Sequence, residues 1–140
     1  MMPDELLLPK AVRLKAAVRG GEYAWRQDDV EGVIRQAEVV GLACLGGEVQ
    51  FQTADGVCEA YWLTFGPGPR REGEPWPDYI GRSADETLDK FHQLCRRTDF
   101  KSLAQEWDLL RTKMEGNAYD PVDDLWFVLY FATESRLRTP

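Results

Sequence analysis

The feature that most constrains the fold is an alternating stretch between residues 47 and 65. Residues 47–53 read GEVQFQT and residues 57–65 read VCEAYWLTF, with Asp55-Gly56 between them. Apolar and polar residues that alternate with a period of two are typical of a β-strand with one buried face. Asp-Gly is a strong hairpin signal, because both central positions of a type I′ turn need positive φ. The stretch therefore predicts an antiparallel β-hairpin.

A two-residue turn at Asp55-Gly56 also predicts the register of this hairpin. By counting from the turn, the facing pairs are Thr53 with Cys58, Phe51 with Ala60, and Val49 with Trp62. These six side chains form one face, which we expect to be core. The opposite face carries Glu48, Gln50, Gln52 and Glu59 near the turn, and Leu63 and Phe65 at the far end. We expect the polar end of this face to be open to water and the apolar end to be covered.

Helical spacing and end signals predict four helices. Asp28 with Glu31, and Ser83 with Glu86, have the spacing of capping boxes, so each pair predicts a helix start. Gly20-Gly21 and Gly41 predict helix ends, since glycine accepts the left-handed conformation found there. The predicted helices cover residues 9–19, 28–40, 83–97 and about 100–114.

The stretch from 121 to 134 gives conflicting signals. Asp120-Pro121 followed by two aspartates resembles a capped helix start. Residues 125–131 are seven consecutive apolar residues rich in aromatic and β-branched types, as in a buried strand. We favour a helix here, and the strand remains the alternative.

These elements predict an α+β fold. A chain of 140 residues is close to the commonest domain size, so residues 1–140 are expected to form one globular domain. The expected architecture is an antiparallel β-hairpin, or a small sheet of two to four strands, packed by four to five α-helices.

The charge balance indicates what kind of partner the chain would meet. With 24 acidic and 17 basic residues, the formal net charge is −7. Such a protein is repelled by nucleic acid and anionic membranes and favours a basic partner, although acidity also serves solubility alone. Three cysteines without C-x-x-C spacing, and no apolar run that approaches a membrane span or signal peptide, favour a cytoplasmic protein.

No linear motif predicts catalysis. His92 is the single histidine, so it lacks a second histidine or a cysteine pair for a metal site. No G-x-S-x-G turn surrounds a serine, and the GPGPRREG segment has neither the helix start nor the Lys-Ser/Thr ending of a phosphate loop. We therefore predict no catalytic residue, no metal ligand and no cofactor.

Residues 64–86 read TFGPGPRREGEPWPDYIGRSADE and form the longest stretch without periodicity. Long loops in compact domains are usually functional or disordered, and four prolines lower the entropy lost when this one is held. Trp, Tyr and Arg dominate interface hot spots, so Arg70, Arg71, Trp76 and Tyr79 are predicted to bind a partner. The alternative is that Trp76 and Tyr79 fold back as a lid over Leu63 and Phe65.

The leading hypothesis is an acidic, non-catalytic protein-binding module of the bacterial immunity or inhibitor type, which neutralises or caps a basic macromolecular partner. Its predicted binding residues are the four loop residues above together with Gln50, Gln52 and Glu59. A rival hypothesis is a small-ligand-binding protein or enzyme with a pocket under residues 66–82 that uses Tyr61, Glu48 or His92. A third is a structural subunit that forms a homodimer through exposed aromatic side chains.

Overall fold

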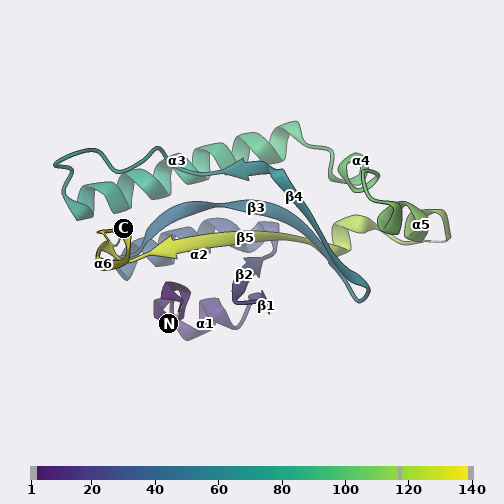
Figure 1. Ribbon diagram of the computed structural model, residues 1–140, viewed down its shortest axis with the longest axis horizontal. Helices are drawn as coiled ribbons and strands as arrows, with labels where there is room; N and C mark the ends of the chain where they lie inside the picture. Colours follow the sequence, from purple (N-terminus) through teal and green to yellow (C-terminus); the bar gives the residue numbers. More distant parts are fainter. Residues whose placement is uncertain (1–2, 117, 139–140) are drawn as a thin grey trace.

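The structure is a computed structural model that describes residues 3–116 and 118–138. Its strands form one antiparallel sheet in the order β1-β2-β5-β3-β4 (Figure 1). The strands are β1 (Ala17–Arg19), β2 (Glu22–Trp25), β3 (Ala43–Thr53), β4 (Gly56–Phe65) and β5 (Leu125–Ala132). The helices are α1 (Lys10–Arg13), α2 (Gln27–Val39), α3 (Trp76–Arg97), α4 (Phe100–Ala104), α5 (Asp108–Gly116) and α6 (Glu134–Arg138), with 3-10 turns at Asp4–Leu7 and Pro121–Asp124.

The predicted hairpin is present as β3 and β4, but its register differs by two residues. Thr53 pairs with Gly56, and Phe51 pairs with Cys58 instead of Ala60. The turn is centred on Ala54 and Asp55, because the Thr53 hydroxyl accepts hydrogen bonds from the amides of Asp55 and Gly56. Near the turn, a shift of two residues keeps the side chains on their predicted faces, so Val49, Phe51, Cys58 and Ala60 are buried as expected. Beyond the register break at Glu48/Val49 the predicted faces are wrong. Phe65 pairs with Gly47 and packs on Phe91 and Phe127 in the core, and Trp62, expected in the core, is 49% exposed.

The prediction of a helix over residues 121–134 is wrong. After a short 3-10 turn capped by the Asp120 side chain, residues 125–132 form β5, which pairs with β3 on one side and β2 on the other. A central strand is buried on both faces and therefore needs no alternation, which explains the continuous apolar run.

The predicted helix over residues 9–19 is also wrong in its second half. α1 ends at Arg13, and Ala17 to Trp25 form a β-hairpin. Gly20 and Gly21 have φ of 58° and 80°, so Gly-Gly is the turn of this hairpin and not a helix end. These two strands extend the sheet to five, beyond the two to four expected.

The remaining helices follow the predictions in part. α2 is confirmed, and Gly41 follows its end with φ of 84°. α3 begins at Trp76, seven residues before the predicted Ser83, because Pro77 fits the first turn of a helix. The predicted 100–114 helix is split into α4 and α5 at residues 105–107. There are six α-helices in the described residues, against the four to five expected.

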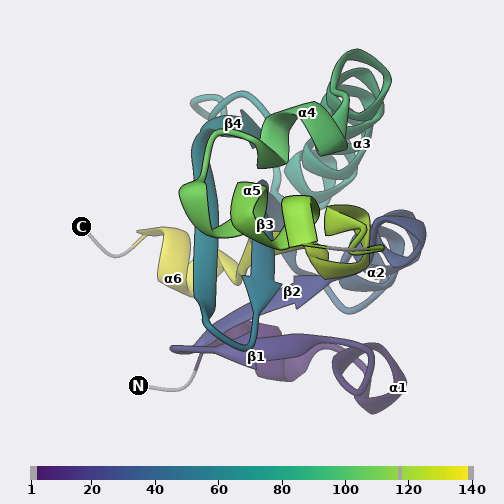
Figure 2. The same ribbon diagram turned by 90° about the vertical axis from the view of Figure 1, so that its right-hand side faces the viewer.

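The sheet separates an apolar core from a polar face. Helices α2 and α3 lie on one side of the sheet (Figure 2), over the buried side chains Val49, Phe51, Phe127, Leu129 and Phe131. None of the helices in the described residues is long and apolar enough to cross a membrane. The other side of the sheet carries the polar residues of β3, β4 and β5.

Candidate functional site

The polar face of the sheet is strongly curved. Arg19 on β1 donates through Nη2 to the carbonyl oxygen of Thr53 at the end of β3, at 3.3 Å. In a flat sheet these strands would lie about 14 Å apart, since β2 and β5 separate them and each spacing is about 4.8 Å. That distance exceeds the reach of an arginine side chain. The β1–β2 hairpin therefore curls over the polar face toward the β3–β4 turn.

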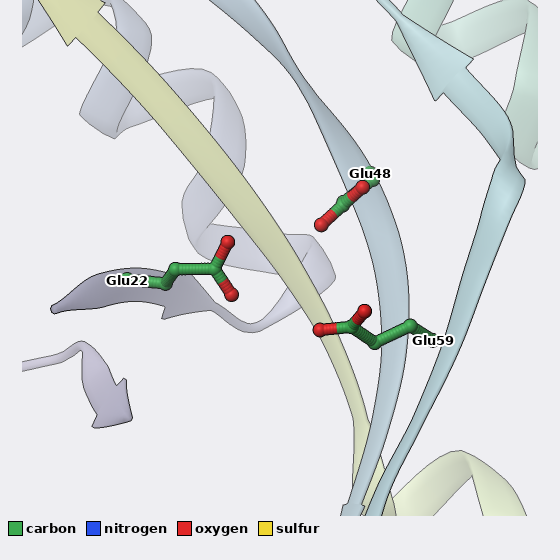
Figure 3. A group of neighbouring side chains, drawn as sticks. All are labelled: Glu22, Glu48 and Glu59. Atoms are coloured by element: carbon green, nitrogen blue, oxygen red, sulfur yellow. The ribbon is translucent and has the colours of Figure 1, made fainter. Parts of the chain in front are cut away.

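Three glutamates from three strands meet on this face, and we call them the glutamate cluster: Glu22 on β2, Glu48 on β3 and Glu59 on β4. One carboxylate oxygen from each lies within 4.8 Å of the other two. Figure 3 shows the three side chains turned toward one another, with β5 running between Glu22 and the other two. Strands distant in sequence thus place three negative charges at one point.

Neutral groups hold the cluster together. The Tyr130 hydroxyl on β5 lies 2.6 Å from Glu22 Oε2 and 3.0 Å from Glu48 Oε1. The Gln50 side-chain amide donates to Glu22 at 3.4 Å and to Glu59 at 3.1 Å. Tyr130 has a single proton for two carboxylates, so these donors do not saturate the six carboxylate oxygens.

No ion pair among the described residues includes the cluster. The ion pairs of residues 3–116 and 118–138 leave out Glu22, Glu48 and Glu59. Arg19 pairs with Glu22 across β1 and β2 through the backbone, but its guanidinium donates to the carbonyl oxygen of Thr53. The three carboxylates are therefore held by neutral donors, with the positive charge of Arg19 on the neighbouring strand.

Burial and repulsion raise the pKa of Glu48. Removal from water is the main cause, and the neighbouring charges of Glu22 and Glu59 add to it, whereas the Tyr130 hydrogen bond acts against it. The pKa of Tyr130 is raised as well, first by burial and then by its hydrogen bonds to Glu22 and Glu48. The cluster thus holds its charge at a cost in stability.

This cost predicts a pH dependence for the variant Glu48→Gln. A carboxyl with a raised folded-state pKa binds more protons when folded, so its contribution to stability is present below 4.5 and is lost as pH rises through the folded pKa. Glutamine does not titrate, so the variant lacks this pH-dependent contribution to the free energy of unfolding. The unfolding free energy of Glu48→Gln minus that of the wild type should therefore increase between about pH 4 and pH 7, as measured by urea denaturation. The exposed Glu72→Gln is the control for the loss of one surface carboxylate. A difference for Glu48→Gln that changes no more with pH than that of this control would contradict the prediction.

Gln50 and Gln52 do not lie on an open edge. They belong to β3, which β5 and β4 flank on both sides, and their exposed fractions are 3% and 8%. Gln52 donates to Gln50, which in turn holds Glu22 and Glu59. The Gln50 amide thus holds two glutamates of the cluster, and the Gln52 amide holds Gln50. Of the three hairpin residues predicted to bind a partner, only Glu59 is exposed.

Beside the cluster, β4 carries exposed aromatic side chains in a bulge. Glu48 pairs with Thr64 but the next residue, Val49, pairs with Ala60, so residues 61–63 have no partner on β3. Tyr61 is 72% exposed and Trp62 is 49% exposed. The Trp62 ring stacks on Trp107, whose ring meets Phe51 of the core.

The proline-rich loop is fastened to α3. Arg82 donates to both carboxylate oxygens of Glu74 at 2.8 Å, and it also bonds Glu86 and the Pro69 carbonyl. Arg82 lowers the pKa of Glu74 to about 2 through these hydrogen bonds. The amide of Gly68 donates to Glu86. Because α3 starts at Trp76, the loop is shorter than expected and covers residues 66–75.

The four loop residues predicted to bind a partner have different environments. Arg70 donates to the Glu74 carbonyl and to Glu134, and its guanidinium lies over the Trp76 ring. The Trp76 indole N–H donates to the Gly41 carbonyl, and Tyr79 is 3% exposed. Of the four, Arg71 alone has an exposed side chain. Partner binding by these residues stays a prediction.

Of the groups considered for catalysis, Glu48 belongs to the cluster, whereas His92 and the cysteines lie apart from it. His92 is on the surface of α3 and faces Glu31 on α2 at 3.2 Å. Cys44 and Cys58 are buried, and burial raises the pKa of the Cys44 thiol to about 11, where it stays protonated at neutral pH. An open hollow of about 440 Å³ adjoins Glu48 and Tyr130 and reaches the loop only at Gly66 and Pro67.

The glutamate cluster also has a spacing that a divalent cation could bridge. Exposed carboxylates gather without a metal in many proteins, so no metal site is proposed. Comparison with known proteins finds no matching family model, no matching curated protein and no matching solved structure.

Sequence reasoning missed Glu22, Tyr130 and the role of Glu48. Glu22 lies on β2, a segment that was assigned to no element after the predicted helix end at Gly20-Gly21, and Tyr130 lies on β5, which was predicted as a helix, so their faces could not be assigned. The Gly20-Gly21 pair, interpreted as a hairpin turn, was the signal that could have placed Glu22 on a strand.

Proposed function

We propose that this protein is an acidic binding module that neutralises or caps a basic macromolecular partner, in the manner of a bacterial immunity or inhibitor protein. The glutamate cluster on the polar face carries the proposal. It brings three carboxylates from distant parts of the chain together, and no ion pair among the described residues includes them. Charges held at a cost in stability favour a partner that compensates them.

The chemistry of the face supports a protein partner. Tyr61 and Trp62 are exposed beside Glu59 on the same strand, and aromatic residues are enriched in protein interfaces. A lysine or arginine of the partner would contact the glutamate cluster, and apolar residues of the partner next to it would contact the rings of Tyr61 and Trp62. Binding in place of catalysis is favoured by the protonated, buried thiols and by the engagement of His92 with Glu31.

The alternative of a small cationic ligand or an enzyme has one observation in its favour. The hollow beside Glu48 and Tyr130 could admit a small molecule next to a carboxyl of raised pKa. It is open to solvent and not enclosed. A protein surface fits this shape better.

An oligolysine peptide tests the site with a defined probe. Backbone amide shifts are followed by NMR at low salt, where surface charges are least screened. We expect the largest shifts around Glu22, Glu48 and Glu59. Binding should weaken about tenfold or more in the triple variant Glu22→Gln, Glu48→Gln, Glu59→Gln, because close charge pairs across an interface are worth more than 1 kcal/mol each.

A matched control has the same change in net charge. Glu72→Gln, Glu106→Gln, Glu115→Gln removes three exposed carboxylates elsewhere on the chain. It should bind oligolysine nearly as well as the wild type. Equal weakening of the two triple variants would show that net charge alone governs binding, and the proposal would fail.

A further inference from the structure

The outer edge of β4 has no strand beside it. In the sheet formed by the described residues, β4 lies at one margin and pairs only with β3. From Gly56 to Ala60 it forms a regular ladder with β3, which ends at the bulge of residues 61–63. Val57, Glu59 and Tyr61 are exposed along this stretch. A regular strand edge of five residues is therefore open to pairing.

An open edge carries backbone N–H and C=O groups that another chain can pair with. Proteins commonly block such edges with charges and bulges. Here the charged residue on the edge is Glu59, which belongs to the glutamate cluster. Its charge repels an acidic strand and attracts a basic one. The bulge limits the length of the edge, and Glu59 selects what can pair there.

The two sides of the edge differ in chemistry. On the polar face, Glu59 lies next to Tyr61 and the other two glutamates. On the helix side, Trp62 is half exposed and stacks on Trp107 at 5.6 Å between ring centroids. Side chains of a strand alternate between the two sides of a sheet. A segment added beside β4 would place every second side chain near carboxylates and the others near the indole rings.

We propose that the outer edge of β4 pairs with an extended segment of the basic partner in which basic and apolar residues alternate. Backbone hydrogen bonds along Gly56–Ala60 hold the segment, its basic side chains meet the glutamate cluster, and its apolar side chains pack on Trp62. This inference rests on the proposed function and specifies the part of the partner that is recognised.

The test compares three peptides of equal length and charge. The first alternates lysine with leucine, the second alternates lysine with serine, and the third is the lysine-leucine peptide with N-methylated backbone amides. Affinities are measured by fluorescence anisotropy with the wild-type chain. The lysine-leucine peptide should bind about tenfold more tightly than either of the others, the size of effect expected when an interface anchor is lost.

The outcomes separate this inference from the proposed function. If all three peptides bind equally and all lose binding to the triple glutamine variant of the cluster, strand pairing is refuted and the acidic site stands. If the lysine-leucine peptide binds that variant as well as the wild type, the acidic site itself fails. NMR gives a second measure, since amides of residues 56–60 should gain protection from hydrogen exchange only with the unmethylated peptide.

Discussion

Replacement of Gly47 by alanine is expected to lower the free energy of unfolding by about 3 kcal/mol, the upper part of the range for an overpacked core. A Cβ atom on Gly47 would lie 2.2 Å from the carbonyl oxygen of Val128 and 2.7 Å from Cζ of Phe65. The first of these is backbone of the central strand β5, which cannot move without breaking the sheet. Urea denaturation at neutral pH measures the change.

Gly32→Ala is the matched control for this prediction. Gly32 lies within α2, and no heavy atom lies within 4 Å of the position that its Cβ would take. Alanine there should raise stability by about 0.5–1 kcal/mol through its helix propensity. If Gly47→Ala unfolds at the same urea concentration as the wild type, the close approach of β3 to β5 beside Glu48 is wrong.

Phe127→Ala is expected to destabilise the protein by about 3–5 kcal/mol, as for other aromatic residues deleted from a core. Phe127 is fully buried on β5, and its ring meets those of Phe91 on α3 and Phe100 on α4 at 5.2 and 5.9 Å. Alanine would leave a cavity between the sheet and two helices. The variant should show a lower melting temperature and a lower urea midpoint.

Tyr61→Ala serves as the comparison for this variant, since it deletes an aromatic ring that is 72% exposed on β4. Its effect on stability should stay within about 0.5 kcal/mol. Similar losses for both variants would show that Phe127 is not central to the core. That result would remove β5 from between β2 and β3, and with it the geometry of the glutamate cluster.

The parts of the fold that sequence predicts are those in which a local pattern determines the structure. The β3–β4 hairpin alternates with a period of two, and the faces of its side chains near the turn were predicted correctly, although the register and the faces of Trp62 and Phe65 were not. α2 has helical spacing and a glycine after its end. In both cases neighbours in sequence carry enough information to fix the element.

The parts that sequence missed depend on distant partners. Residues 125–131 are apolar throughout, which suits a buried helix and a central strand equally, and only pairing with β2 and β3 decides between them. The sequence predicts a loop for Trp76 to Gly81 because four prolines lie between Phe65 and the capping signal at Ser83. In the structure Ser83 is buried within α3, where its hydroxyl donates to Ile80 and accepts from the amide of Cys44.

The candidate site was predicted only in part for the same reason. Glu59 and the polar face were foreseen from the alternation of β3 and β4. Glu22 and Tyr130 reach the polar face through β2 and β5, which pair across about a hundred residues of sequence. No spacing in the sequence predicts the hydrogen bond between these two residues.

The position of β5 also bears on how the protein is made. The ribosome delivers this strand last among the five, yet it occupies the middle of the sheet. Until it emerges, no strand joins the two earlier hairpins into one sheet, and contacts of such long sequence separation form slowly. The glutamate cluster can therefore form only after β5 has been synthesised, because Tyr130 on this strand holds Glu22 and Glu48.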